Sequence, residues 1–279
     1  MTTATRTAAF ALAGLLPMAA ACGDSGTPDQ APTAARGDPP PAVAFDLPRG
    51  DDPVELDPAE FTGEIDHPYW PMAPGDQWRY REIDEGGEEV EVVVTVTTET
   101  RRIANGITAR VVRDTVTLDG ALIEDTFDWY AQDAAGNVWY LGEDTAEFDG
   151  GQMTSTAGSF EAGVDGALPG IIMPADPRDG MAYRQEYYQG EAEDNGEVLS
   201  VDEQAEVPFG HFDGVLLTKD TITIEPDVLE YKLYAPGVGP VLVFGVSGGG
   251  GREELVSFET VAEEVARAAG TTPLGQAYP

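Results

Sequence analysis

The feature that most constrains this chain is the alternation of valine with glutamate and threonine in residues 88–98. In an extended chain every second side chain points to the same face, so the valines from Val90 to Val96 share one face. A strand with one apolar face must pack that face against other elements. A β-sheet is therefore the expected unit of the fold.

Turn signals follow this strand at short intervals. Asn105-Gly106 and Asp119-Gly120 are typical of tight hairpin turns, and residues 133–136 give a third turn signal. Consecutive hairpins form a meander, in which the strand order of an antiparallel sheet follows the sequence. We expect an all-β domain: a single curved antiparallel sheet or half-open β-barrel of about ten strands, with a short helix near the C-terminus.

Aromatic residues flank the third turn. If its four residues are unpaired, Tyr130 lies opposite Trp139, and Trp129 lies opposite Tyr140. We expect these pairs to pack in the core of the domain. An aromatic-lined ligand cleft is the alternative.

Cys22 is the only cysteine of the chain. The parts of an export signal precede it: Arg6, an apolar run at residues 8–18, and three alanines at residues 19–21. The apolar run is shorter than the roughly 20 residues that a transmembrane helix needs. Export of the chain is therefore expected.

The junction at Cys22 resembles the lipobox of bacterial lipoproteins, in which signal peptidase II cuts before the cysteine and the cysteine is then acylated. The family prefers leucine where this chain has Ala19. The resemblance implies an exported protein anchored to the bacterial cell membrane or outer envelope by a lipid on Cys22. The alternative is an ordinary signal peptide, cut near Ala21, that leaves Cys22 free.

Composition divides the chain into four parts. Residues 1–21 are the expected signal peptide, and residues 22–66 are rich in proline, alanine, aspartate and glycine. Such a composition predicts a disordered, lipid-anchored linker. Residues 67–262 carry the strand signals of the antiparallel β-domain, and residues 263–279 form a C-terminal tail. A single cysteine cannot form an internal disulfide, so a hydrophobic core must hold the domain together.

The chain is strongly acidic, with 51 aspartates and glutamates against 15 lysines and arginines and a formal net charge of −36. Such a field repels nucleic acid and anionic lipid head groups, so we expect no nucleic-acid partner. Acidic loops at residues 142–144, 176–180 and 191–196 offer oxygen ligands for calcium. None has the spacing of a calcium-binding loop, so no metal ligand is assigned and calcium stays an alternative.

The sequence assigns no catalytic residue. Residues 245–249 match the G-x-S-x-G nucleophile pattern, but no histidine follows Ser247, and the glycines after it cannot begin a stable helix. His67 and His211 lie far apart, and with one cysteine they cannot form a His/Cys zinc site. We therefore expect a protein that is not an enzyme.

One stretch indicates a binding surface. Residues 183–188 combine three tyrosines, an arginine and a carboxylate, and they follow an irregular segment at 143–177. The residues expected to contact a ligand are Tyr183, Arg184, Tyr187, Trp129 and Trp139. The alternative is that one face of the 183–188 strand lies in the core while its other face carries an Arg–Glu pair on the surface.

Residues 75–80 near the start of the domain and residues 234–241 near its end are similar to uncharacterised bacterial envelope lipoproteins. In those proteins a curved antiparallel sheet follows a lipid anchor, and some related half-barrels hold lipid. The middle of the domain, including residues 128–133 and 183–187, is similar to one exported bacterial family with no assigned activity. The resemblance implies a fold and a location, and it assigns no catalytic residue.

We expect a lipid-anchored envelope or surface protein of a non-catalytic type. It would bind a small apolar ligand in the concavity of its sheet, bind a protein partner, or serve structurally. Two alternatives stay open: an exported hydrolase that uses loop carboxylates, and a calcium-dependent surface adhesion module.

Overall fold

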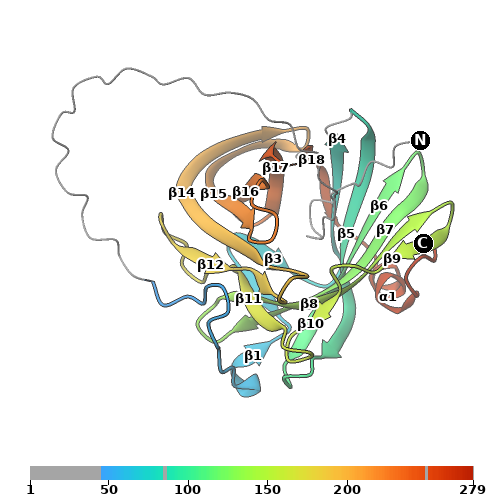
Figure 1. The fold of residues 1–279 in the computed structure, drawn as a ribbon. Coiled ribbons are helices and arrows are strands. Elements are labelled where there is room, and N and C mark those ends of the chain that lie inside the picture. Colours follow the sequence, from blue (N-terminus) through green and yellow to red (C-terminus); the bar gives the residue numbers. More distant parts are fainter. Residues whose placement is uncertain (1–44, 84–86, 249–250, 279) are drawn as a thin grey trace, which may run out of the picture.

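The computed structural model describes residues 45–83, 87–248 and 251–278, so the expected signal peptide and Cys22 lie outside the described residues. Over these residues the chain forms eighteen β-strands, one 3₁₀-helix and one α-helix (Figure 1). The strands curve into a large antiparallel sheet that is nearly closed, like a barrel. The predicted all-β class, curved sheet and C-terminal helix are confirmed, although more strands are present than the expected number. Across the same described ranges, no helix combines the length and apolarity needed to cross a membrane.

The elements fall into a short lead-in and a long series of barrel strands. The lead-in consists of η1 (Pro58–Glu60), β1 (Phe61–Thr62), β2 (Ile65–His67) and β3 (Trp70–Met72). The first barrel strands are β4 (Asp76–Ile83), β5 (Glu89–Arg102), β6 (Thr108–Leu118), β7 (Ala121–Asp133), β8 (Val138–Asp149), β9 (Gln152–Ser155), β10 (Phe160–Glu161) and β11 (Leu168–Met173). The remaining elements are β12 (Ala182–Arg184), β13 (Glu186–Tyr187), β14 (Asp194–Val207), β15 (Gly210–Ile222), β16 (Leu229–Ala235), β17 (Gly239–Ser247), β18 (Arg252–Thr260) and α1 (Glu263–Thr271).

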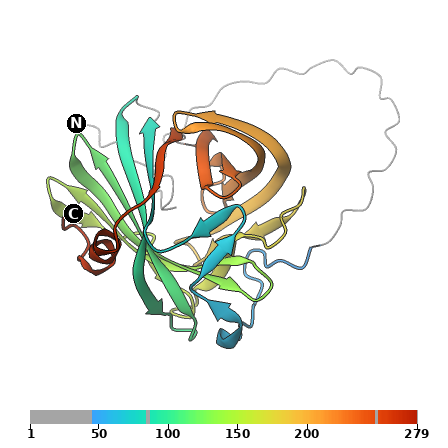
Figure 2. The same cartoon turned by 180° about the vertical axis from the view of Figure 1, so that it is seen from behind.

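Strand pairing follows the sequence around most of the barrel. Strands β4 to β8 form one antiparallel meander, β14 to β18 form a second, and pairing of β18 with β4 joins them. On the opposite side β12 pairs with β14, while β13 pairs with β11, which in turn pairs with β8. Figures 1 and 2, from opposite sides, show the sheet wrapped around one interior.

The additional strands include three within the segment that the sequence marks as irregular. Strands β9, β10 and β11 all lie there, and glycine permits two close approaches of backbone to backbone. A Cβ on Gly142 would lie 2.2 Å from the Phe160 carbonyl oxygen, and one on Gly170 would lie 2.0 Å from the Gln185 carbonyl oxygen. These strands are short and lack an alternating pattern, so periodicity alone does not reveal them.

The turn between β7 and β8 is longer than predicted. It contains residues 133–137. The Asp133 carboxylate stabilises the turn by accepting hydrogen bonds from two of its backbone N–H groups, each at 2.9 Å. Tyr130 consequently lies opposite Tyr140, and the predicted pairing of Tyr130 with Trp139 is wrong. The two tyrosine rings stack in the core, with their centroids 5.0 Å apart.

Helix α1 packs on the outer face of β5 and β6. Arg113 on β6 holds the chain there: its guanidinium binds both oxygens of Asp125, at 2.8 and 2.5 Å. The same side chain donates to the carbonyl oxygens of Ala269 and Thr272, at 2.9 and 2.8 Å. The side chains of Arg113 and Asp125 are both fully buried. Through its hydrogen bonds to Ala269 and Thr272, Arg113 ties the C-terminal end of the chain to the barrel wall.

Candidate functional site

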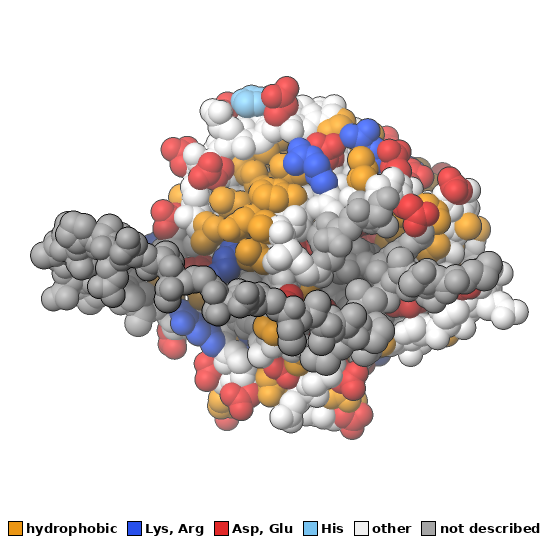
Figure 3. Space-filling view, turned by 45° about the horizontal axis from the view of Figure 1, so that its top comes forward, with side chains coloured by type: hydrophobic (Ala, Val, Ile, Leu, Met, Phe, Trp, Pro, Cys, Tyr) orange, Lys and Arg blue, Asp and Glu red, His pale blue; other side chains and the backbone are white. Residues whose placement is uncertain are grey.

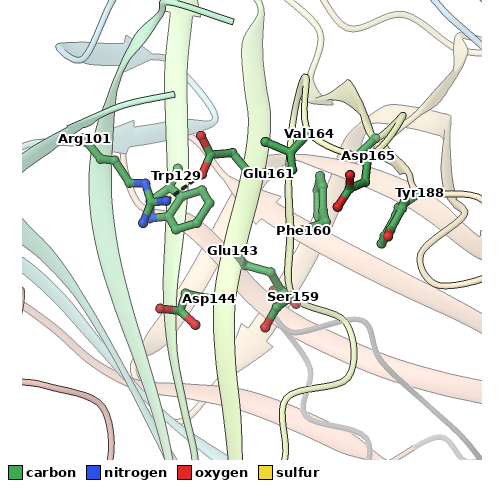
Figure 4. Close-up of a pocket in the computed structure, with 11 residues that line it drawn as sticks. Arg101, Trp129, Glu143, Asp144, Ser159, Phe160, Glu161, Val164, Asp165 and Tyr188 are labelled. Atoms are coloured by element: carbon green, nitrogen blue, oxygen red, sulfur yellow. Dashed lines mark hydrogen bonds and ion pairs between the residues drawn. The ribbon is translucent and has the colours of Figure 1, made fainter. Parts of the chain in front are cut away.

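A pocket of about 370 Å³ lies where β5, β7, β8 and β10 meet the loops that follow β10 and β13 (Figure 4). Its volume falls within the range of roughly 300–1,000 Å³ that is typical of small-molecule sites. The residues that line it are Arg101, Trp129, Glu143, Asp144, Ser159, Phe160, Glu161, Val164, Asp165, Ala167 and Tyr188. Three aromatic and four acidic residues therefore meet around a single arginine.

One wall of the pocket is built from Arg101, Trp129 and Glu161. The Arg101 guanidinium lies over the Trp129 ring, 3.8 Å from its centroid, and forms an ion pair of 2.5 Å with the Glu161 carboxylate. The other oxygen of Glu161 accepts a hydrogen bond from the backbone N–H of Ala104 at 2.7 Å. Cation–π contact and ion pairing thus fix this wall before any ligand arrives.

Glu143 connects the pocket to the inside of the barrel. Its carboxyl lies 2.7 Å from the Tyr140 hydroxyl, which also lies 2.7 Å from the Asp128 carboxyl. One hydroxyl proton cannot serve two carboxylates, so one of the two acids carries a proton when both hydrogen bonds form. Burial raises the pKa of Asp128 to about 7, and burial with the nearby Asp128 carboxyl raises the pKa of Glu143 well above its usual range.

Two exposed carboxylates complete the pocket. Asp144 follows Glu143 on β8, and Asp165 lies on the loop after β10, where its φ is +50° and the neighbouring Gly166 has a φ of +89°. In the described part of the chain, neither carboxylate forms an ion pair or a side-chain hydrogen bond. Both are therefore available to a ligand.

The charges around the pocket do not balance. Arg101 is neutralised by Glu161, while Asp144 and Asp165 form no ion pair with any basic side chain that the structure describes. The chain as a whole is acidic, and acidic side chains are widespread on the face of the molecule that Figure 3 shows. An occupant that brings positive charge would gain most from this arrangement.

A second group of acids lies inside the barrel, on the face of the sheet that also carries Tyr80 and Tyr140. The buried members are Glu82, Asp114, Asp128, Glu143, Glu186, Asp194, Asp220, Glu230 and Glu253. Lys232 is the basic side chain that the described residues place among them, with its amine 3.0 Å from Asp220 and 3.9 Å from Glu230. Burial raises the pKa of Asp114 and of Glu253 well above the usual range of a carboxyl. Much of the interior acid is thus held in the neutral form.

The two tryptophans predicted to contact a ligand lie in different surroundings. Trp129 lines the pocket under Arg101. Trp139 lies beneath the lead-in, where its indole N–H donates to the Asp133 carboxylate at 2.8 Å and its ring contacts that of Phe61, with centroids 6.1 Å apart. Of these two side chains, Trp129 is the one that a ligand in the pocket would meet.

The other three predicted contacts lie away from the pocket. Tyr183 is buried inside the barrel against Gly196, and Tyr187 is half-buried in β13. Arg184 is fully buried; its guanidinium donates to the carbonyl oxygen of Pro169 at 2.9 Å and to two backbone carbonyls of the lead-in. Since Glu186 is buried as well, the alternative of an exposed Arg–Glu pair is wrong.

Sequence reasoning missed several residues of the pocket, including Arg101 and Phe160, whereas Tyr188 belongs to the 183–188 stretch that it marked as a binding surface. These come from segments separated by tens of residues, and no local pattern joins them. The acidic segment at 142–144 was noticed as a potential calcium loop, and it lies within β8. Among the residues described here, no group of three histidine, cysteine, aspartate or glutamate side chains is placed to hold a metal ion.

Comparison with known proteins gives one structural neighbour. No family model matches the chain, and no curated protein matches it. Among solved structures, it is similar to a candidate lipoprotein from Parabacteroides distasonis ATCC 8503, with a TM-score of 0.38 and 12% sequence identity. The match covers 68% of this chain and 98% of that one. Function is therefore inferred from the geometry of this chain's own residues.

Proposed function

We propose that this chain is an exported, lipid-anchored binding protein of a non-catalytic type, and that its pocket takes a small organic cation. The observation that carries the proposal is the pair of carboxylates, Asp144 and Asp165, with which no basic side chain of the described residues forms an ion pair. A cationic ligand replaces the apolar ligand expected from the sequence, because the pocket and the barrel interior are both lined with acids. An apolar ligand would have to desolvate those carboxylates without compensation.

The aromatic rings of the pocket favour an ammonium group over a metal ion. Phe160 and Tyr188 line the pocket together with Trp129, whose face Arg101 already occupies. Phe160 is held in place by an edge-to-face contact with Tyr140, with ring centroids 5.5 Å apart. A ring beside a carboxylate attracts an alkylammonium through both its quadrupole and the opposite charge.

Choline and its neutral isostere 3,3-dimethylbutan-1-ol test the proposal as matched probes. Titration of the protein, followed by NMR, is expected to show choline binding that weakens with salt, and much weaker binding of the isostere. In a variant with both Asp144→Asn and Asp165→Asn, choline affinity should fall at least about tenfold. The control Asp149→Asn changes an exposed carboxylate of β8 outside the pocket and should bind as the wild type does. Equal affinity for choline and the isostere, or an unchanged double variant, would reject the proposal.

Hydrolysis is the second candidate function, and one observation favours it. Glu143 has a raised pKa and lines the same pocket as the exposed Asp144. In glycosidases a carboxyl of raised pKa donates a proton while a second carboxylate acts as base or nucleophile. Turnover of an aryl glycoside panel that disappears in Glu143→Gln would support this function, and no turnover by the wild type would reject it.

Membrane anchoring rests on Cys22, which lies outside the described residues. Cells that express the full chain and are fed a clickable fatty acid should label the wild-type protein and not the Cys22→Ala variant. The expected change is complete loss of label, because the chain has no other cysteine. Label that persists in the variant would refute acylation at this residue.

A further inference from the structure

The barrel closes through a seam formed by two very short strands. β12 pairs with β14 at three positions, and β13 pairs with β11 at two. Between them the backbone N–H of Gln185 donates to the carbonyl oxygen of Asp194 at 2.7 Å. Most meander strands pair over longer runs, as β5 and β6 do, although β17 and β18 also pair at only three positions. The seam is therefore among the places where the fewest backbone hydrogen bonds resist opening.

A pair of buried acids lies across this seam. Glu186 on β13 and Asp194 on β14 are only 2% and 1% exposed, and the Glu186 carboxyl donates a hydrogen bond to the Asp194 carboxylate. Such a bond exists only while one of the two carboxyls is protonated. Apart from that proton, the oxygens of Asp194 receive no hydrogen bond from described residues.

The acidic groups around Glu186 and Asp194 further favour the protonated form of this pair. Glu186 faces Asp128 on β7 and the Glu143 and Tyr140 side chains on β8. The groups that face Asp194 are Asp220 on β15 and Glu230 and Lys232 on β16. The Lys232 amine is already engaged by Asp220 at 3.0 Å, so it offsets only part of this negative charge.

The short strand β12 also bonds residues 48–52, which lie near the start of the described chain. The backbone N–H of Arg184 donates to the carbonyl oxygen of Pro48 at 2.8 Å, and the Arg49 guanidinium donates to the carbonyl oxygen of Ala182 at 3.0 Å. The Arg184 guanidinium binds the carbonyl oxygens of Gly50 and Asp52. The start of the described chain is thus fastened to the same short strand that closes the barrel.

We propose that the seam is a proton-operated closure: it is shut while Glu186 and Asp194 share a proton, and it opens when both carboxyls are ionised. Opening would free β12 from β14 and release the segment around Pro48 that β12 holds. Burial raises the pKa of Asp194 to about 7, and burial with the adjacent Asp194 raises the pKa of Glu186 well above its usual range. Both shifts are upward, so closure is complete in mild acid and is lost as the pH rises through the raised pKa of the shared proton. This inference does not depend on what the pocket binds.

Hydrogen exchange measured by mass spectrometry between pH 5.5 and 8.5 tests the seam, after correction for the intrinsic pH dependence of exchange. In the wild type, amides of residues 182–187 are expected to lose protection about tenfold per pH unit once the pH passes the raised pKa of the shared proton, the slope for release of one proton. Amides in the paired core of β5 and β6 should lose much less. If the protection of residues 182–187 in the wild type is constant across this pH range, the proposal is overturned.

Two variants identify the carboxyls responsible. Glu186→Gln keeps a donor toward Asp194 without a charge, so its seam amides should stay protected at pH 8.5. Asp194→Asn should behave in the same way, and it serves as the second route if Glu186→Gln folds poorly. The matched control Glu203→Gln changes an exposed glutamate of β14 and should open like the wild type. If a folded seam variant opens with the wild-type pH profile, this pair of acids does not control the seam.

Discussion

Replacing Asp128 by asparagine tests whether the cluster of Asp128, Tyr140 and Glu143 shares a proton in the folded protein. Asparagine resembles protonated aspartic acid in shape, and its amide can donate to the Tyr140 hydroxyl oxygen. The hydroxyl proton of Tyr140 is then free to serve Glu143, 2.7 Å away. The variant therefore forms at every pH the hydrogen-bond pattern for which the wild type needs a bound proton.

The magnitude follows from the raised pKa of Asp128, which is about 7 in the fold against a reference value of 3.8. Between about pH 4 and pH 7 the folded protein binds one more proton than the unfolded chain at this cluster. The stability due to that proton is fully present below pH 4 and is lost as the pH rises through 7. At 1.36 kcal/mol for each pKa unit, the total is about 4 kcal/mol, of which about 3 kcal/mol falls between pH 5 and pH 8.

Urea unfolding followed by tryptophan fluorescence at pH 5, 6, 7 and 8 gives the free energy of unfolding of both proteins. The variant should gain stability relative to the wild type as the pH rises, by about 3 kcal/mol over this range. Asp149→Asn, on the exposed side of β8, should show a difference that stays nearly constant. If the difference between Asp128→Asn and the wild type does not change with pH, the cluster does not share a proton and the reasoning fails.

Two further substitutions test the packing that surrounds the site. Arg113→Met leaves Asp125 buried without its partner and should lower the free energy of unfolding by about 3–5 kcal/mol in urea titrations, with a loss below about 1 kcal/mol counting against a structural role for the ion pair. Gly170→Ala places a Cβ 2.0 Å from the Gln185 carbonyl oxygen and should cost about 1–3 kcal/mol by the same measurement. The control Gly210→Ala meets nothing closer than 4.0 Å, and equal losses in the two glycine variants would contradict the close approach at the seam.

The hairpins of this fold could be predicted because their signals are local. The alternating valines of β5 and the Asn-Gly and Asp-Gly turns each specify their neighbours within about ten residues. Closure of the barrel is not local: β18 pairs with β4 from the other end of the domain. At Gln185 the strand changes partner from β14 to β11, which no alternating pattern of six residues can indicate.

The site was harder to predict than the fold, because its acids occupy positions that a simple polar–apolar pattern assigns to solvent. The side chains of Asp128 and Glu143 are buried inside the barrel, although the polar–apolar alternation of their strands predicts exposed carboxylates at these positions. Trp129 was recognised from its aromatic character, but its partner Arg101 comes from the far end of another strand. Burial, which decides which acids keep a proton, is a property of the closed barrel and not of any one segment.

The acidic residues of this chain form an exposed group and a buried group, and Glu143 connects the two. The formal charge of −36 counts every carboxyl as ionised, whereas burial raises the pKa of Asp128 and of Glu143 and so favours their protonated forms. Glu143 belongs to the buried cluster and also lines the pocket, so a cation bound there as proposed would favour its ionised form. The free energy that couples cation binding to ionisation of Glu143 is reciprocal. The bound cation lowers the pKa of Glu143, and a rise in pH must therefore tighten cation binding. Because the cluster shares one proton between Asp128 and Glu143, this linkage should be strongest over the pH range in which that proton is released.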